Sequence, residues 1–205
     1  MLKLLSRAFL IFSVVGASLA WSNEEAAREA VIEVVDAFRT QIVADKDVLS
    51  KDPALLEERV NAILENVVDF DDFSKKVMGK YYRRASPEQR VRFATVTKDT
   101  LLKTYGASLL ELDADRIEVL PLGPQGRGKE TKVDVDFQME AGGLLNISFY
   151  MEESKQGRWL LSNIVINNIN FGLTFRKQFG VMMEQNKNNI ELAINAWRES
   201  LAKKS

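Results

Sequence analysis

The stretch KVDVDFQMEAGGLLNISFYM, Lys132 to Met151, decides the fold class of this chain. Apolar and polar residues alternate from Val133 to Met139 and again from Leu145 to Met151, which is the period of strands that bury one face. Gly142 and Gly143 separate the two runs, where a hairpin turn favours glycine. The stretch therefore predicts an antiparallel hairpin with an apolar inner face and a polar outer face.

The segments on either side extend this hairpin into a sheet. Residues 116–121 are typical of a short strand and residues 159–166 of a buried one, which makes a meander of about four strands. Helical spacing of apolar residues predicts two helices before the sheet, within 31–42 and 60–68, and two after it, near 171–185 and 188–203. We expect an α+β fold in which helices cover one face of the sheet.

A long helix is predicted to begin at Ser86 and to run to about Glu111. Ser86 is a good N-cap residue, Pro87 suits the first helical position, and Gln89 can complete a capping box. The wide apolar face of this helix is expected to lie against the inner face of the sheet. The sequence YYRR, residues 81–84, comes just before this helix start and needs another explanation.

The first twenty residues have the pattern of a secretory signal peptide. MLKLLSR precedes the apolar run AFLIFSVVGASLA, which ends in small residues at Ser18 and Ala20. No later segment approaches the roughly 20 apolar residues of a transmembrane helix. We expect residues 1–20 to be removed on export and residues 21–205 to form a single α+β domain.

Composition excludes several classes of function. The chain contains no cysteine and no histidine, so disulfides, thiol catalysis and imidazole-based triads are ruled out. From Glu24 to Ser74 there are 14 acidic and 5 basic residues, whereas from Lys75 to Lys103 there are 9 basic and 2 acidic. These charges are explained either as solvated helix faces or as surfaces for charged partners.

Two short motifs resemble ligand sites, but local structure explains them better. GPQGRGKE, residues 123–130, comes close to a phosphate-binding loop, yet a predicted strand follows it and Glu130 stands where a hydroxyl is needed. DFDDF, residues 69–73, is rich in carboxylates, but Asp69 is placed to cap a helix whose first turn favours Asp71 and Asp72. We predict a turn and a helix start.

The apolar inner face has two explanations that composition alone does not separate. It belongs either to a packed core or to a cavity for an apolar ligand. An enzyme with an isomerase-like pocket would need a buried acid on this face, and the two clearest strands show none.

Three segments resemble one known family. VDFDDFSKKVMGKYYRRASPEQRVRF (68–93), LLKTYGASL (101–109) and GRWLLSNIVINNINFGLTFRKQFG (157–180) are similar to the MlaC, or toluene-tolerance, family of periplasmic phospholipid-binding transport proteins. The chain departs from the family pattern at Met78, where leucine is usual, and at Tyr82, where tryptophan is usual. It also carries an asparagine cluster within 163–170.

The resemblance implies a periplasmic phospholipid carrier that is not an enzyme and maintains the lipid asymmetry of the outer membrane. Its partners would be an outer-membrane lipoprotein and porin complex and an inner-membrane ABC transporter. It would bind no nucleic acid and no cofactor besides its lipid cargo, and would work as a monomer. A periplasmic chaperone or adaptor without lipid cargo is the alternative.

The resemblance also implies that the apolar inner face lines a lipid cavity between the sheet and the helices. Its expected lining is Phe70, Phe73, Val77, Met78, Tyr81, Tyr82, Phe93, Val96, Tyr105, Leu109, Val135, Phe137, Met139, Ile147, Phe149, Met151 and Phe175. Tyr81 and Tyr82 would lie at the boundary between cavity and water, because a phenol has an apolar body and a polar tip. A basic rim for a head group or an acidic partner is expected from Arg83, Arg84 and Arg90, together with Arg92.

Overall fold

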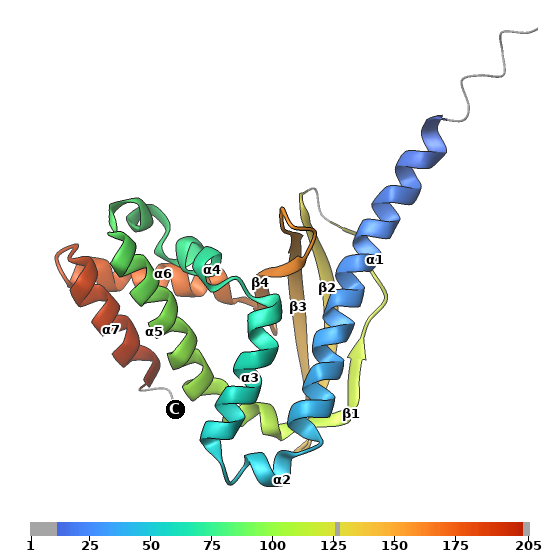
Figure 1. The fold of residues 1–205 in the computed structure, drawn as a ribbon, viewed down its shortest axis with the longest axis horizontal. Helices are drawn as coiled ribbons and strands as arrows, with labels where there is room; N and C mark the ends of the chain where they lie inside the picture. Colours follow the sequence, from blue (N-terminus) through green and yellow to red (C-terminus); the bar gives the residue numbers. More distant parts are fainter. Residues whose placement is uncertain (1–11, 126–127, 203–205) are drawn as a thin grey trace, which may run out of the picture.

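The computed structural model describes residues 12–125 and 128–202 (Figure 1). The predicted signal peptide, residues 1–20, lies mostly outside the residues whose placement and side chains are described. Among the described residues, no helix combines the length and the apolar character that crossing a membrane requires.

The sheet is an antiparallel meander of five strands in the order β1-β2-β3-β4-β5. The strands are β1 (Leu112–Val119), β2 (Glu130–Met139), β3 (Leu144–Glu153), β4 (Trp159–Ile166) and the short β5 (Ile169–Asn170). The predicted hairpin is β2 and β3, paired in register with Val133 opposite Phe149 and Val135 opposite Ile147. The α+β class and the four longer strands are therefore confirmed, and β5 is an addition.

The two faces of the sheet differ as the alternation predicts. Val133, Val135 and Met151 are fully buried in one apolar cluster. On the opposite face the Asn146 amide donates a hydrogen bond to Asp136 across 2.7 Å, and the Lys132 ammonium lies 2.9 Å from Asp134. Polar pairs within β2 and between β2 and β3 thus occupy the face opposite the apolar cluster.

The helix that covers the apolar face is α1 (Phe12–Phe38), which runs diagonally across the sheet in Figure 1. Its residues Ala27, Val31 and Val35 recur every four positions and are fully buried against the strands. The expectation that the helix after Ser86 covers this face is wrong. That helix, α5 (Pro87–Tyr105), packs chiefly on other helices, because its fully buried Phe93 belongs to their core.

The helices that contain this second core form a helical lobe. It consists of α4 (Phe70–Met78), the 3-10 turn η2 (Gly79–Arg84), α5, α6 (Phe171–Gln185) and α7 (Ile190–Ala202). Its centre holds Phe93, Phe179 and Trp197, with ring centroids of Phe93 and Phe179 4.7 Å apart. The lobe lies beside the sheet in Figure 1 and is joined to it through β4 and β5.

A third apolar cluster closes the end of the molecule where the sheet and the helical lobe approach each other. It is built from the π-helical turn η1 (Arg39–Val43), the short α2 (Lys46–Leu49), α3 (Pro53–Val67) and the end of α5. Ile42, Leu49 and Leu56 are its most buried members, and Leu102 is the buried residue that α5 contributes. The chain then passes through the 3-10 turn η3 (Ala107–Glu111) into β1, so α5 ends at Tyr105 rather than near Glu111.

The predicted caps are all present. The Ser86 hydroxyl accepts a hydrogen bond from Gln89 N, and the Gln89 side chain accepts one from Ser86 N, which completes the capping box. The Asp69 carboxylate accepts hydrogen bonds from the backbone of Asp71 and Asp72, so DFDDF is a helix start as expected. In GPQGRGKE, Glu130 begins β2, and residues 126–127 lie outside the described range.

Candidate functional site

A groove of about 750 Å³ lies between α1 and α3 and reaches the start of β4. Its floor is apolar and is formed by Val34 of α1, Ile63 and Val67 of α3, and Trp159 of β4. Val34, Val67 and Trp159 also belong to the cluster that α1 makes with the sheet. The groove is therefore continuous with the apolar interior beneath it.

Small side chains explain why the two helices leave this space. Ala26, Ala30 and Ala37 of α1 and Ala62 of α3 line the groove. A methyl group fills much less of the space between two helices than leucine or phenylalanine would. These alanines can be read from the sequence of the two helices, but the predicted cavity lining consists of large apolar residues and does not include them.

The predicted cavity residues lie in two separate cores. Those in the sheet cluster are Leu109, Val135, Phe137, Met139, Ile147, Phe149 and Met151. Those in the helical lobe are Phe73, Val77, Met78, Tyr81, Tyr82, Phe93, Val96 and Phe175, with Phe70 against the edge of Phe73. Tyr105 is 37% exposed. They do not form one surface, and none of them lines the groove. Their part in lipid binding stays a prediction.

The two sets of predicted cavity residues differ in whether a ligand could reach them. In the helical lobe the rings of Phe175 and Phe179 pack edge-to-face on Trp197, with centroids 5.5 and 6.2 Å away. This arrangement fills its own interior, as an ordinary core does. The sheet set lies in the same cluster as the groove floor, where Phe149 and Trp159 are only partly buried. A ligand that enters the groove would therefore reach the sheet set first.

The arginines before and within α5 have different environments. Arg83 and Arg84 are exposed and have no hydrogen-bond or ion-pair partner among the described residues. Arg90 stacks on the Tyr82 ring, 4.4 Å from its centroid, and donates a hydrogen bond to Tyr82 O across 3.0 Å. Arg92 pairs with Glu191 and donates to Asn195, so it joins α5 to α7 instead of extending a basic rim.

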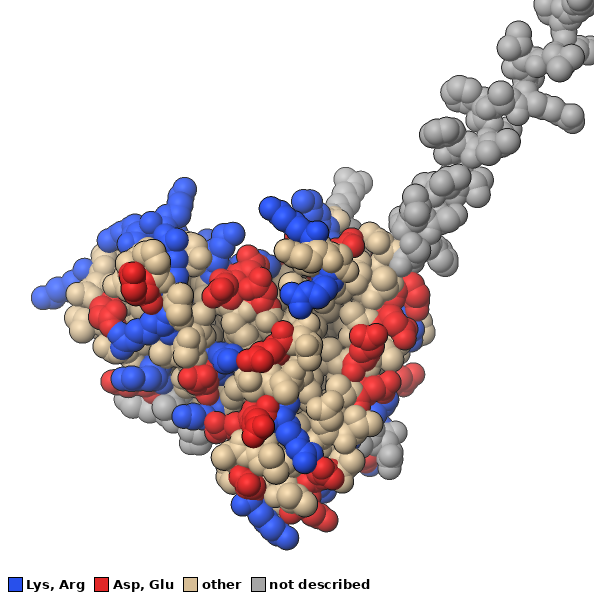
Figure 2. Space-filling model, in the orientation of Figure 1, with Lys and Arg blue, Asp and Glu red and all other residues tan. Residues whose placement is uncertain are grey.

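The basic residues of η2 do not border the groove. They lie on the helical lobe, whereas the groove is formed by α1, α3 and β4. Figure 2 shows basic side chains gathered at the upper left, over the connection between α4 and α5, and acidic side chains along α1. A head group at the mouth of the groove would therefore meet other residues than those predicted.

The groove has charged residues of its own. Glu29 and Glu33 stand one helical turn apart on α1, and Arg158 precedes Trp159 at the start of β4. All three side chains are exposed. The mouth of the groove thus carries charges of both signs around an apolar floor.

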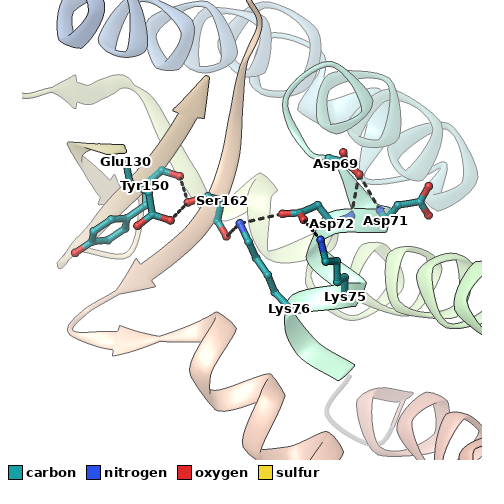
Figure 3. Close-up of polar contacts among 8 residues, drawn as sticks. All are labelled: Asp69, Asp71, Asp72, Lys75, Lys76, Glu130, Tyr150 and Ser162. Atoms are coloured by element: carbon teal, nitrogen blue, oxygen red, sulfur yellow. Dashed lines mark hydrogen bonds and ion pairs between the residues drawn. The ribbon is translucent and has the colours of Figure 1, made fainter. Parts of the chain in front are cut away.

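The junction between α4 and β4 is held by polar contacts (Figure 3). Lys76 lies 3.0 Å from Asp72 and donates a hydrogen bond to Ser162 O across 3.4 Å. The Ser162 hydroxyl in turn can donate its one hydrogen to Tyr150 O on the neighbouring β3 or to the Glu130 carboxylate at the start of β2. Among the described residues, no group of three or more acidic side chains is arranged to hold a metal ion.

The asparagine cluster has a structural explanation. Asn167 and Asn168 have φ angles of 46° and 65°, which asparagine tolerates, and they form the two-residue turn between β4 and β5. Asn170 caps α6 by accepting from Leu173 N, and Asn163 accepts from Gly172 N. These side chains therefore build the entry to α6.

Comparison with known proteins identifies the family. The family model for MlaC protein matches residues 32–199. The toluene tolerance protein ttg2D of Pseudomonas putida is 33% identical over 176 residues, which cover 83% of this chain and 81% of that protein. The intermembrane phospholipid transport system binding protein MlaC of Haemophilus influenzae is 23% identical over 172 residues, with coverage of 82% and 78%.

A solved structure shares the fold. It is a phospholipid-binding protein from Ralstonia solanacearum in complex with a phospholipid, with a TM-score of 0.74 and 20% identity. The match covers 86% of this chain and 97% of that one. Because the family model spans most of the sequence and a relative above 30% identity covers most of both chains, this chain belongs to the MlaC family.

Proposed function

We propose that this protein is a periplasmic phospholipid carrier that receives acyl chains in the groove between α1 and α3. The observation that carries the proposal is the apolar floor of that groove, which continues into the sheet cluster. Its volume of about 750 Å³ lies within the range of roughly 300–1,000 Å³ that ligand pockets occupy. The family is one of lipid-binding carriers and not of enzymes, which agrees with a chain that lacks histidine and cysteine.

The energetics require an enclosed site. Two acyl chains contain roughly 30 methylene groups, and exposing them to water would cost more than about 20 kcal/mol at roughly 0.8 kcal/mol each. The groove admits the chains, and partly buried members of the sheet cluster such as Phe149 provide further apolar contacts. Met139 and Met151 suit this task because an unbranched thioether adapts to chains of different shape.

The carrier would exchange lipid between an outer-membrane lipoprotein and porin complex and an inner-membrane ABC transporter. The exposed cations of η2, Arg83 and Arg84, support a docking surface for acidic partners, because they have no partner among the described residues. This basic surface lies on another part of the molecule than the groove, so docking and lipid retention would depend on different residues.

Native mass spectrometry tests the carrier proposal. The protein is purified from a bacterial periplasm without detergent, and bound lipid is identified after denaturation. Ala62→Trp fills the groove, and Ala54→Trp is a matched control, since both alanines are exposed on α3 but only Ala62 lines the groove. We expect one phospholipid on the wild type and on Ala54→Trp, and loss of that lipid from Ala62→Trp.

Two other outcomes would contradict the proposal. A bare polypeptide mass for all three proteins, not changed by added lipid, would favour the chaperone or adaptor. Lipid that stays bound to Ala62→Trp would show that the groove is not the site of the acyl chains.

A further inference from the structure

The charged residues of the groove form a pattern that suits one class of head group. Glu29, Glu33 and Arg158 are the charged members of its described lining, and none has a side-chain partner among the described residues. The neighbouring acids of α1 do have partners: Glu25 lies 3.1 Å from Arg28, and Asp36 lies 2.9 Å from Arg39. Among the acids of α1 without a partner in the described part of the chain, which also include Glu24, Glu29 and Glu33 are the ones that line the groove.

The backbone fixes the position of Arg158. The turn from Ser154 to Arg158 is closed by a hydrogen bond from Ser154 N to Arg158 O, across 2.8 Å. The Ser154 hydroxyl accepts a second bond from Arg158 N across 3.1 Å, and Gly157 supplies a φ of 75°. The next residue, Trp159, belongs to the groove floor, so the Arg158 side chain extends from a fixed backbone position beside the apolar surface where acyl chains would enter.

We infer that the groove selects phospholipids with a zwitterionic head group, and this inference rests on the proposed carrier function. A guanidinium binds phosphate oxygens through paired hydrogen bonds. The carboxylates of Glu29 and Glu33 attract the ammonium group of a head group such as ethanolamine. An anionic glycerol head group would also meet Arg158, but its net negative charge would be repelled by the two carboxylates.

Competitive loading tests this inference on the full mature protein. The delipidated protein is incubated with vesicles of phosphatidylethanolamine and phosphatidylglycerol in equal amounts and with identical acyl chains, and the bound lipids are extracted and quantified. We expect phosphatidylethanolamine to be enriched about three- to tenfold, because exposed charge pairs contribute modestly. The preference should fall in 0.5 M salt, because the Debye length is then only about 4 Å and the exposed charges of the groove are screened.

Variants of the charged groove residues test whether the preference for one head group arises in the groove. The double variant Glu29→Gln/Glu33→Gln should bring the lipid ratio close to one by raising the share of phosphatidylglycerol. Glu58→Gln is the matched control, because Glu58 is an exposed acid of α3 without a partner among the described residues and does not line the groove. Arg158→Gln should lower the loading of both lipids, since both carry a phosphate.

The possible failures are distinguishable. If no variant and no wild-type protein binds lipid, the carrier function itself is wrong. If lipid is bound but the wild-type ratio is one, or if Glu29→Gln/Glu33→Gln keeps the wild-type ratio, the selectivity is wrong and the carrier function stands.

Discussion

At the scale of single residues, Gly79 is constrained both by its backbone conformation and by a neighbouring side chain. It ends α4 with φ at 54° and ψ at −123°, and a Cβ placed there would lie 2.8 Å from Arg176 Nε. Residues other than glycine rarely adopt this backbone conformation, and a Cβ at this position would also force the long Arg176 side chain to move. A glycine after a helical segment is a common helix end, but the contact with α6 depends on how two helices that are distant in sequence pack.

Gly79→Ala should therefore lower the free energy of unfolding by about 1–3 kcal/mol. Gly180→Ala is the control, because Gly180 lies within α6 and nothing lies within 4 Å of a Cβ there. That change should raise the free energy of unfolding by about 0.5–1 kcal/mol, since alanine favours a helix more than glycine does. Urea unfolding measures both, and equal effects of the two changes would contradict the argument.

At the scale of elements, a buried hydrogen bond joins α5 to α7. Trp197 Nε1 donates to Thr97 Oγ1 across 3.0 Å, and both side chains are fully buried. Thr97→Val would leave the indole N–H without an acceptor and should cost about 1–3 kcal/mol of stability. Thr100→Val is the matched control, because the Thr100 hydroxyl only donates to Val96 O of its own helix.

Chemical denaturation of the two valine variants checks this link. We expect the Thr100→Val change to stay within about 1 kcal/mol of the wild type, since it leaves no buried donor unpaired. If Thr97→Val were as stable as Thr100→Val, the hydrogen bond between the helices would not contribute to stability.

A second contact between elements, the ion pair of Glu65 on α3 with Lys98 on α5, contributes a stability that depends on pH. The pKa of Glu65 is lowered from its ordinary value of 4.5, first by a hydrogen bond from the Asn61 amide and then by the Lys98 ammonium, 3.2 Å away. Because the folded protein holds this proton more weakly than the unfolded chain does, the carboxylate stabilises the fold above about pH 4.5. That contribution is lost as the pH falls through the folded pKa.

Glu65→Gln should thus be less stable than the wild type at pH 7, and the difference should shrink as the pH is lowered below about 4.5. Urea midpoints measured from pH 7 to pH 3 give the comparison. Glu58→Gln on the same helix removes an acid that has no partner among the described residues, so its difference from the wild type should vary less with pH. A constant difference for Glu65→Gln would contradict the assignment.

The elements themselves were largely predictable, but their packing was not. The alternation in β2 and β3 and the capping box of α5 depend on neighbours close in sequence, and they are confirmed. An apolar helix face, by contrast, does not specify what it packs against. The apolar faces of α1 and α5 look alike in sequence, yet α1 covers the sheet and α5 enters the helical lobe.

At the scale of the whole molecule, the same dependence on packing explains why the sequence did not locate the groove. Large apolar residues were expected to line a cavity, but in the helical lobe they fill their own core. The groove arises instead where small side chains such as Ala30 and Ala62 leave the space between two helices next to Trp159 unfilled. A cavity is a property of the space that side chains do not occupy, so a list of the bulkiest residues does not locate it.

The separation of groove and basic surface leads to a prediction about transfer. Arg83→Ser/Arg84→Ser removes the exposed cations of η2 and leaves the groove unchanged. If this surface docks to acidic partners, transfer of a fluorescent phospholipid to membranes that contain the partner transporter should slow about tenfold at low salt, because complementary charges raise association rates. The amount of lipid that copurifies should not change.

Lys51→Ser/Lys103→Ser is the matched control, since both lysines are exposed and lie outside η2 and the groove lining. It removes the same charge, so a general effect of net charge on membrane encounter would slow both double variants equally, and the docking role of η2 would be rejected. Slowing confined to the arginine variant, and abolished in high salt, would instead show that the carrier meets its partner through the helical lobe while the lipid stays in the groove.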